Sequence, residues 1–199
     1  MNRESMEYDV VIVGAGPSGL SAAIQLKKLC KEHNKDFSVC LVEKGSQIGA
    51  HTLSGAVLEP RALNELIPDW EKKNSPVRTK VKNEKFIYLS ENSSIKFPNF
   101  LLPKVMHNSN NYIISLGNFN IWLGKQAEEL GVEIYPGFAA AELLLDDKGQ
   151  TYGIATGDHG ILKNGERGPN FQQGIEIHAK YTLFAEGCRG HLGKQIIKN

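Results

Sequence analysis

Residues 8–19 read YDVVIVGAGPSG, an apolar and mostly β-branched run that ends in a glycine-rich segment. Such a run predicts a strand that is buried on both faces, as in a parallel sheet. Residues 17–31 follow with apolar side chains at helical spacing, and residues 38–43 predict a second buried strand. The order strand, helix, strand therefore predicts two parallel strands joined by a crossover helix.

The glycines of this segment have the spacing GxGxxG between a strand and a helix, which is the context of a dinucleotide site. Gly14 permits the tight turn, Gly16 lets a pyrophosphate approach the backbone, and Gly19 lets the helix pack against the strand. The pyrophosphate would lie at the N-terminus of the helix that starts at Pro17. Glu43 ends the second strand, where a carboxylate accepts hydrogen bonds from both ribose hydroxyls and disfavours a 2′-phosphate.

Composition argues against a protein embedded in a membrane, and the balanced charge disfavours a nucleic-acid-binding protein. Of the 199 residues, 41% are apolar, which suits a packed core and is too low for a protein embedded in a membrane. The 23 basic and 22 acidic side chains give no electrostatic reason to expect nucleic acid as a partner. Cys30, Cys40 and Cys188 are too scattered for a disulfide framework, a zinc site or an iron–sulfur site, and they are predicted to be buried.

The rest of the chain continues with strands and helices. The predicted fold class is α/β, a Rossmann-like parallel sheet with a crossover helix and antiparallel β insertions. The chain ends just after a strand and the first residues of a helix, so it is expected to be truncated at the C-terminus. Further helices are predicted at 59–67 and 119–130, and further strands at 85–90, 94–97, 132–135, 140–145, 152–156 and 175–184.

Two resemblances narrow the cofactor and the function. Residues 9–26, DVVIVGAGPSGLSAAIQL, resemble the FAD signature of glutathione-reductase-like flavoproteins, with Pro-x-Gly-Leu after the first glycines. Later blocks resemble the family of electron transfer flavoprotein–ubiquinone oxidoreductases, and the likeness covers nearly the whole chain. These blocks are GAHTLSGA (49–56), LEP (58–60), NYIISLGN (111–118), QAEELGVE (126–133), YPGFAAAE (135–142), GIAT (153–156) and FAEGCRGHL (184–192).

The family resemblance implies a peripheral membrane flavoenzyme of the respiratory chain. In this family FAD takes electrons from reduced electron transfer flavoprotein and passes them, with a [4Fe-4S] cluster, to ubiquinone. The implied location is the cytoplasmic face of a bacterial inner membrane, which the short N-terminus favours, or the matrix side of the mitochondrial inner membrane. The family's cluster cysteines and its later flavin-contacting motif have no counterpart here, so this chain alone is expected to bind FAD weakly and to be inactive.

The predicted cofactor site combines the glycine turn with residues that the resemblance implies. His51, in the loop after the second strand, is either a flavin contact or an ordinary loop histidine. Glu186 and Gly187 end a strand, where the ligands of such sheets gather, and a simple turn is the alternative explanation. No catalytic residue or metal ligand is predicted, because flavin chemistry belongs to the cofactor. The predicted cofactor-binding residues are Gly14, Ala15, Gly16, Pro17, Ser18, Gly19, Glu43, Lys44, His51, Leu53, Ser54, Gly55, Glu186 and Gly187.

The apolar segment 97–106 is the predicted contact with the membrane surface. The resemblance identifies it with a membrane-facing hairpin of the family, and Lys104 is able to reach lipid headgroups. A loop folded over its own core is the alternative. The predicted division is a first segment of the FAD-binding domain at 1–75, an inserted β-hairpin with this loop at 76–111, and the continued, truncated FAD-binding domain at 112–199.

Two other functions stay open. A related FAD-dependent reductase or monooxygenase would use a nicotinamide donor, although the sequence holds no second GxGxxG to bind one. An inactive gene fragment is the non-enzymatic alternative. One departure from related flavoenzymes is Ser115, since many of them carry an arginine at this place.

Overall fold

In the computed structural model, which describes residues 3–53 and 55–198, the predicted strand–helix–strand unit forms the centre of a six-stranded sheet. The strand order is β8-β2-β1-β13-β10-β9, with the first four strands parallel and the last two antiparallel to their neighbours. The strands are β1 (Ser5–Val13), β2 (Val39–Glu43), β8 (Glu133–Pro136), β9 (Ala140–Leu145), β10 (Thr151–Thr156) and β13 (Glu176–Phe184).

Both faces of β1 are covered, as the uninterrupted apolar run predicts. Helix α1 (Pro17–Glu32) joins β1 to β2 and packs against them with its buried side chains Leu20, Ala23 and Ile24. A second cluster contains Val11 and Val13 of β1, Ile177 of β13 and Leu192 of α4 (His191–Lys198). The parallel strands therefore lie between α1 and a layer that includes α4.

The chain divides into two compact units. One contains the residues up to Thr52 and from Asn120 onward, and the other is Leu53–Phe119. The second unit is wider than the predicted insertion at 76–111, because strands on either side of that segment pair with one another. Strand β7 (Tyr112–Ile114) pairs with β3 (Ala56–Leu58) and with β4 (Thr79–Lys80).

The second unit has its own small core around Trp70. The Trp70 and Tyr112 rings meet edge to face with centroids 5.7 Å apart, and the Trp70 Nε1 donates a hydrogen bond of 2.7 Å to Asn64 Oδ1. Leu63 and Val77 are buried with them. The helical segments of this unit are α2 (Arg61–Leu66), η1 (Trp70–Lys72), η2 (Asn99–Leu101) and η3 (Lys104–Met106), and α3 (Leu116–Glu129) crosses the boundary at Phe119.

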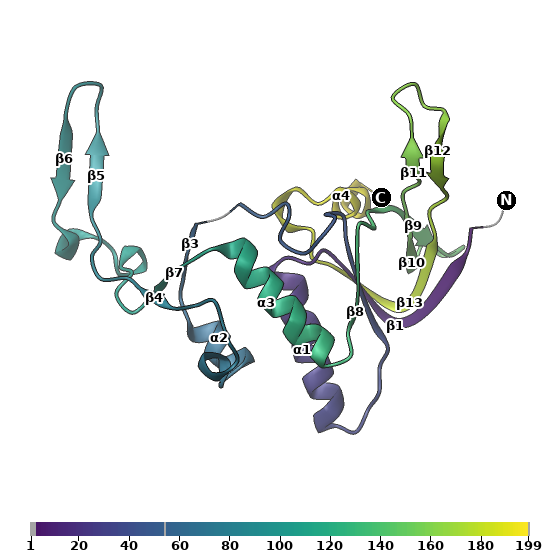
Figure 1. The fold of residues 1–199 in the computed structure, drawn as a ribbon, viewed down its shortest axis with the longest axis horizontal. Helices are drawn as coiled ribbons and strands as arrows, with labels where there is room; N and C mark the ends of the chain where they lie inside the picture. The colour runs from purple at the N-terminus through teal and green to yellow at the C-terminus, as the bar shows by residue number, and fades with distance from the viewer. Residues whose placement is uncertain (1–2, 54, 199) are drawn as a thin grey trace. The chain divides into compact units, whose positions relative to one another are not determined.

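Each unit carries one projecting hairpin (Figure 1). In the second unit, β5 (Phe86–Leu89) pairs with β6 (Ser94–Phe97), which confirms the predicted hairpin. In the first unit, β11 (His159–Ile161) pairs with β12 (Arg167–Gln172), a hairpin that the sequence analysis does not include.

Candidate cofactor site

The glycine turn joins the carboxyl end of β1 to α1. Gly14 has a φ of +107°, a conformation that L side chains rarely adopt, and a Cβ at this position would lie 2.6 Å from the Ala185 carbonyl oxygen. The Gly14 amide donates to the Val42 carbonyl at 2.8 Å, and the Ala185 amide donates to the Val13 carbonyl at 2.9 Å. The turn is therefore held at the point where β1, β2 and β13 end together.

Gly16 and Gly19 have opposite surroundings. No atom lies within 4 Å of a Cβ placed on Gly16, whose φ of −79° is ordinary for any residue. A Cβ on Gly19 would collide with the Gly14 carbonyl oxygen. Gly19 is thus required for helix packing, whereas Gly16 leaves open space directly before the N-terminus of α1, where amide groups and the helix dipole favour an anion.

Glu43 connects the glycine turn to the segment after β2. Its Oε2 accepts a hydrogen bond of 2.9 Å from the Ala15 amide, and its Oε1 accepts one of 2.8 Å from the Gly45 amide. Each carboxylate oxygen has a second acceptor position, so the same group is still able to receive ribose hydroxyls. The carboxylate therefore shapes the site before any ligand arrives.

A cleft of about 630 Å³ opens at these strand ends, within the first unit. Its size lies in the range of small-molecule and cofactor sites. Gly19 does not line it, because this glycine packs against Gly14 behind the turn. The predicted residues that line the cleft are Gly14, Ala15, Gly16, Pro17, Ser18, Glu43, Lys44, His51, Glu186 and Gly187.

Three predicted residues fall elsewhere in the chain. Leu53 and Gly55 belong to the second unit, and Leu53 is 90% exposed. Ser54 lies outside the described residues. Their contact with a cofactor stays a prediction.

Glu186 lines the cleft, but its carboxylate also has a partner within the chain. Oε1 accepts hydrogen bonds from the His191 amide at 3.0 Å and the Leu192 amide at 3.2 Å, and Oε2 accepts one from the Gly193 amide at 2.9 Å. These amides are the unpaired donors at the start of α4. Glu186 is thus the cap of α4, a structural role that the sequence pattern does not predict.

Several residues that line the cleft are missing from the predicted set. Phe138, Ala139 and Ala140 follow β8, and Arg189 and His191 follow β13. The sequence holds a signal for these five residues. The ligands of parallel sheets gather at the carboxyl ends of several strands, and both β8 and β13 are predicted as strands. With Lys44 and Arg189, the cleft carries two cationic side chains beside Glu43, which suits a diphosphate.

The cysteines show no sign of a metal site. Cys30 and Cys40 are buried as predicted, and burial raises the pKa of the Cys40 thiol to about 12. The prediction is wrong for Cys188, which is exposed because it lies in the short turn before α4. In the part of the chain that the structure describes, no three His, Cys, Asp or Glu side chains gather as metal ligands would.

The chain is similar in sequence to a Rossmann-like family model and to oxidoreductases from a bacterium and from mitochondria. Residues 12–71 match a family model described as an NAD(P)-binding Rossmann-like domain. The chain is 59% identical to the probable electron transfer flavoprotein-ubiquinone oxidoreductase of Acinetobacter baylyi, over 99% of this chain and 35% of that protein. It is 56% identical to the mitochondrial electron transfer flavoprotein-ubiquinone oxidoreductase of Homo sapiens, over 100% of this chain and 32% of that protein. The predicted resemblance is confirmed, and the chain spans about a third of the length of the curated relatives it matches.

Solved structures confirm the fold. A geranylgeranyl bacteriochlorophyll reductase-like protein from Thermoplasma acidophilum superposes with a TM-score of 0.62 at 22% identity, over 91% of this chain and 39% of that chain. The flavin-dependent monooxygenase PieE, solved with FAD, gives a TM-score of 0.62 at 18% identity, over 96% of this chain and 32% of that chain. The predicted α/β, Rossmann-like fold is therefore confirmed.

Proposed function

Because the whole chain matches about a third of the length of electron transfer flavoprotein–ubiquinone oxidoreductases, we propose that it is the FAD-binding part of such an oxidoreductase. The complete protein takes electrons from reduced electron transfer flavoprotein and delivers them to ubiquinone, with the aid of a [4Fe-4S] cluster. None of the three cysteines of this chain belongs to a metal-binding group among the described residues, so the cluster ligands are assigned to another part of the polypeptide.

The open space at Gly16 is the observation that carries the cofactor assignment. Gly16 has no side chain to fill this space, and the N-terminus of α1 lines the cleft. Glu43 holds the glycine turn through its hydrogen bond from the Ala15 amide. Flavin, when bound, supplies the uptake and release of electrons that protein side chains cannot perform. The task of this chain is to bind and orient the ADP half, with α1 and the side chains of Lys44 and Arg189 facing the diphosphate.

Replacement of Gly16 tests this assignment. In Gly16→Ala the new Cβ meets no protein atom and fills the space left for the pyrophosphate, so the fold should survive while FAD affinity falls by roughly tenfold or more. FAD titration followed by flavin fluorescence measures the affinity, and far-UV circular dichroism reports the fold.

Gly157→Ala is the matched control, because its Cβ would make only an ordinary contact of 3.6 Å with Ala141. It should bind FAD like the unmodified chain. If Gly16→Ala binds FAD as tightly as Gly157→Ala, the diphosphate does not lie at this turn.

A nicotinamide-dependent flavoenzyme is the second candidate function. Two observations favour it, the description of the matched family model and the monooxygenase among the structural neighbours. Anaerobic mixing separates the candidates, with the complete FAD-loaded protein offered reduced electron transfer flavoprotein or NADH and NADPH. Bleaching of the bound flavin by electron transfer flavoprotein alone supports the proposed function, and bleaching by a nicotinamide supports the alternative.

We also propose that the second unit contacts the surface of an inner membrane. Among the described residues no helix is long and apolar enough to cross a bilayer, so the contact would be peripheral. Its support is the exposure of Val105 (92%), Phe100 (82%) and Leu101 (66%), all in the predicted segment 97–106. Replacing Leu101 and Leu102 by Glu should abolish binding to lipid vesicles, and undiminished binding would contradict the proposal.

A further inference from the structure

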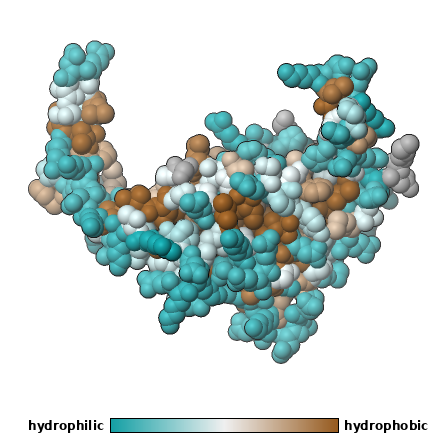
Figure 2. Space-filling view, viewed as in Figure 1, coloured by the Kyte–Doolittle hydropathy of each residue, from teal (hydrophilic) through white to brown (hydrophobic). Residues whose placement is uncertain are grey.

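The second unit exposes a set of apolar side chains on the β5–β6 hairpin and on the segment that follows it, here called the apolar surface. The register of the β5–β6 hairpin pairs Phe86 with Phe97 and Tyr88 with Ile95. Paired residues point to the same face, so one face of the hairpin is wholly apolar. Figure 2 shows apolar residues along the hairpin below a hydrophilic turn. The apolar surface consists of Phe86, Tyr88, Ile95, Phe97, Phe100, Leu101, Val105 and Met106, all exposed.

Four lysines lie close in sequence to this surface. Lys85 precedes β5, Lys96 lies in β6, Lys104 lies in η3, and Lys82 lies in the segment that leads to the hairpin. The pairing of Lys96 with Ile87 places Lys96 on the other face of the hairpin. All four are exposed, and among the described residues none is in an ion pair. Their charges are therefore available to an outside partner.

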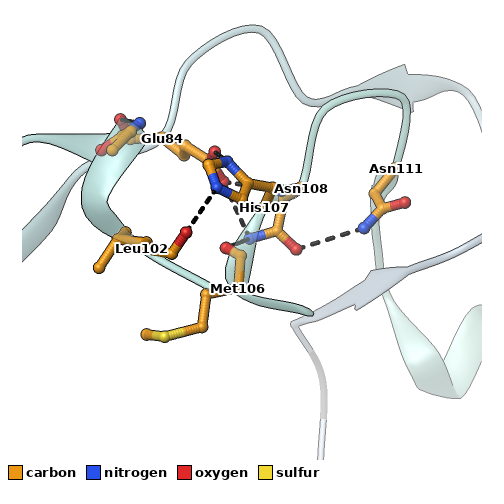
Figure 3. A network of polar contacts seen from close by, with 7 residues as sticks. Glu84, Leu102, Met106, His107, Asn108 and Asn111 are labelled. Atoms are coloured by element: carbon orange, nitrogen blue, oxygen red, sulfur yellow. Dashed lines mark hydrogen bonds and ion pairs between the residues drawn. The ribbon is translucent and has the colours of Figure 1, made fainter. Parts of the chain in front are cut away.

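The acidic group closest in sequence to these lysines is turned inward. Figure 3 shows Glu84 in a polar network with His107 and Asn108, which ties the start of the hairpin to the end of the apolar segment. Glu84 Oε2 accepts hydrogen bonds from the Asn108 amide at 2.8 Å and from Asn108 Nδ2 at 3.1 Å, and Glu84 Oε1 lies 3.4 Å from His107 Nδ1. The carboxylate is thus occupied by its own unit and does not neutralise Lys82 or Lys85.

The same network fixes the apolar segment in place. Asn99 Nδ2 donates to the Glu84 carbonyl at 3.0 Å, and His107 Nε2 lies 3.1 Å from the Leu102 carbonyl oxygen. These contacts hold both ends of the segment that contains η2 and η3. The apolar side chains and the lysines are therefore presented together by a braced backbone.

We infer that the apolar surface with its four lysines binds an anionic lipid bilayer in preference to a neutral one. The inference rests on the proposed membrane contact and adds the class of lipid. Apolar side chains enter the boundary between headgroups and acyl chains, while lysine ammonium groups meet the lipid phosphates. A second copy of this surface would bring like charges together, which disfavours self-association as the way it is covered.

Vesicle binding tests the choice of lipid. The probes are vesicles of phosphatidylcholine alone and vesicles that also contain phosphatidylglycerol, with bound protein measured by flotation over a series of salt concentrations. The test variant replaces Lys82, Lys85, Lys96 and Lys104 by Gln. The matched control replaces Lys31, Lys35, Lys148 and Lys163, four exposed lysines of the first unit, and so has the same net charge.

The unmodified chain should bind the anionic vesicles more tightly, and the preference should shrink as salt rises. Each lysine near an anionic bilayer contributes roughly a fivefold gain, so the test variant should lose on the order of a few hundredfold of its binding to these vesicles. The control variant should lose much less.

Three results would overturn the inference in distinguishable ways. Equal, salt-independent binding to both vesicles would leave the membrane contact standing and remove the lipid preference. An equal loss in the test and control variants would assign the preference to net charge instead of this surface. No binding of the unmodified chain to any vesicle would remove the membrane contact itself, and a dimer in gel filtration that the apolar substitutions dissociate would then identify a second copy as the occupant.

Discussion

Asp9 connects three neighbouring strands of the main sheet. Its Oδ2 accepts hydrogen bonds from the Ser38 amide at 2.9 Å and the Ser38 hydroxyl at 3.1 Å, just before β2 begins. Its Oδ1 lies 2.6 Å from Lys180 Nζ on β13. The hydrogen bond from Lys180, followed by those from Ser38, lowers the pKa of Asp9 from 3.8 to about 2.

The lowered pKa of Asp9 predicts a pH dependence of stability. A carboxylate with a depressed pKa stabilises the folded chain above its unfolded pKa, and this contribution is lost as the pH falls from 3.8 towards about 2. Asp9→Asn should therefore unfold more easily than the unmodified chain at neutral pH, and the difference should close across that interval. Urea unfolding at a series of pH values measures it.

Asp147→Asn is the control, because Asp147 is exposed in a turn and its replacement should change stability little. A constant difference between Asp9→Asn and the unmodified chain at all pH values would show that the carboxylate charge of Asp9 is not responsible.

At the scale of single elements, α4 depends on one carboxylate. Glu186 receives the first amides of the helix, and Leu192 of this helix is fully buried in the main core. Gly190 leaves room for this arrangement, since a Cβ there would lie 2.7 Å from Glu186 Oε2. The cap and the glycine together set the start of α4 beside the cleft.

Two alanine substitutions three residues apart test this arrangement. Gly190→Ala should displace the Glu186 side chain and cost about 1 kcal/mol of stability, the usual value of a lost helix cap. Gly193→Ala should be neutral or stabilising, because its Cβ would lie 3.6 Å from Glu186 Oε2 and alanine favours a helix. Thermal unfolding measures both, and equal midpoints for the two variants would contradict the cap.

Elements with a local signal were predictable from the sequence, and those made by distant contacts were not. Strand β1, helix α1 and the glycine turn follow from periodicity and spacing alone. Helix α3 starts earlier than the predicted residue 119, and Ser115 Oγ accepts a hydrogen bond of 3.4 Å from the Asn118 amide at this start. The sequence does not predict the β11–β12 hairpin, because apolar residues do not alternate regularly along its two strands.

The cofactor site shows the same limit. The residues that we propose for the ADP half lie in one continuous stretch and at the end of the next strand, so the sequence alone is enough to propose them. Phe138 and Arg189 reach the cleft only because the sheet order places β8 beside β2 and β13 beside β1, whose end carries the glycine turn. Glu186 illustrates a further difficulty, since its partners on α4 depend on a turn that the sequence pattern does not reveal.

At the scale of the whole molecule, the two chain segments of the first unit meet where the second unit is inserted. Thr52 and Asn120 stand at its two chain boundaries, and Asn120 Nδ2 donates a hydrogen bond of 3.1 Å to Thr52 Oγ1. The ends that receive the intervening segment are therefore neighbours. A segment inserted between neighbouring ends need not contribute to the fold that surrounds it.

Removal of the insertion is expected to leave the first unit folded. Replacing residues 56–114 with a short Gly-Ser linker keeps the start of α3 and the Thr52–Asn120 hydrogen bond. The shortened chain should unfold cooperatively, retain FAD binding and lose its binding to vesicles. Circular dichroism, flavin titration and flotation measure these properties, and loss of cooperative unfolding would show that the two units fold as one.

Strand β13 is paired on one side along nearly its whole length and on the other only in part. β1 accompanies it from Glu176 to Phe184, whereas its register with β10 covers Glu176 to His178. Tyr181 and Leu183, in the remaining part, are 68% and 40% exposed. In the part of the chain that the structure describes, no strand pairs with residues 179–184 on the β10 side. An unpaired strand edge beside apolar side chains is the arrangement that recruits foreign strands. Purified material should accordingly show concentration-dependent aggregation that a charged residue at position 183 suppresses.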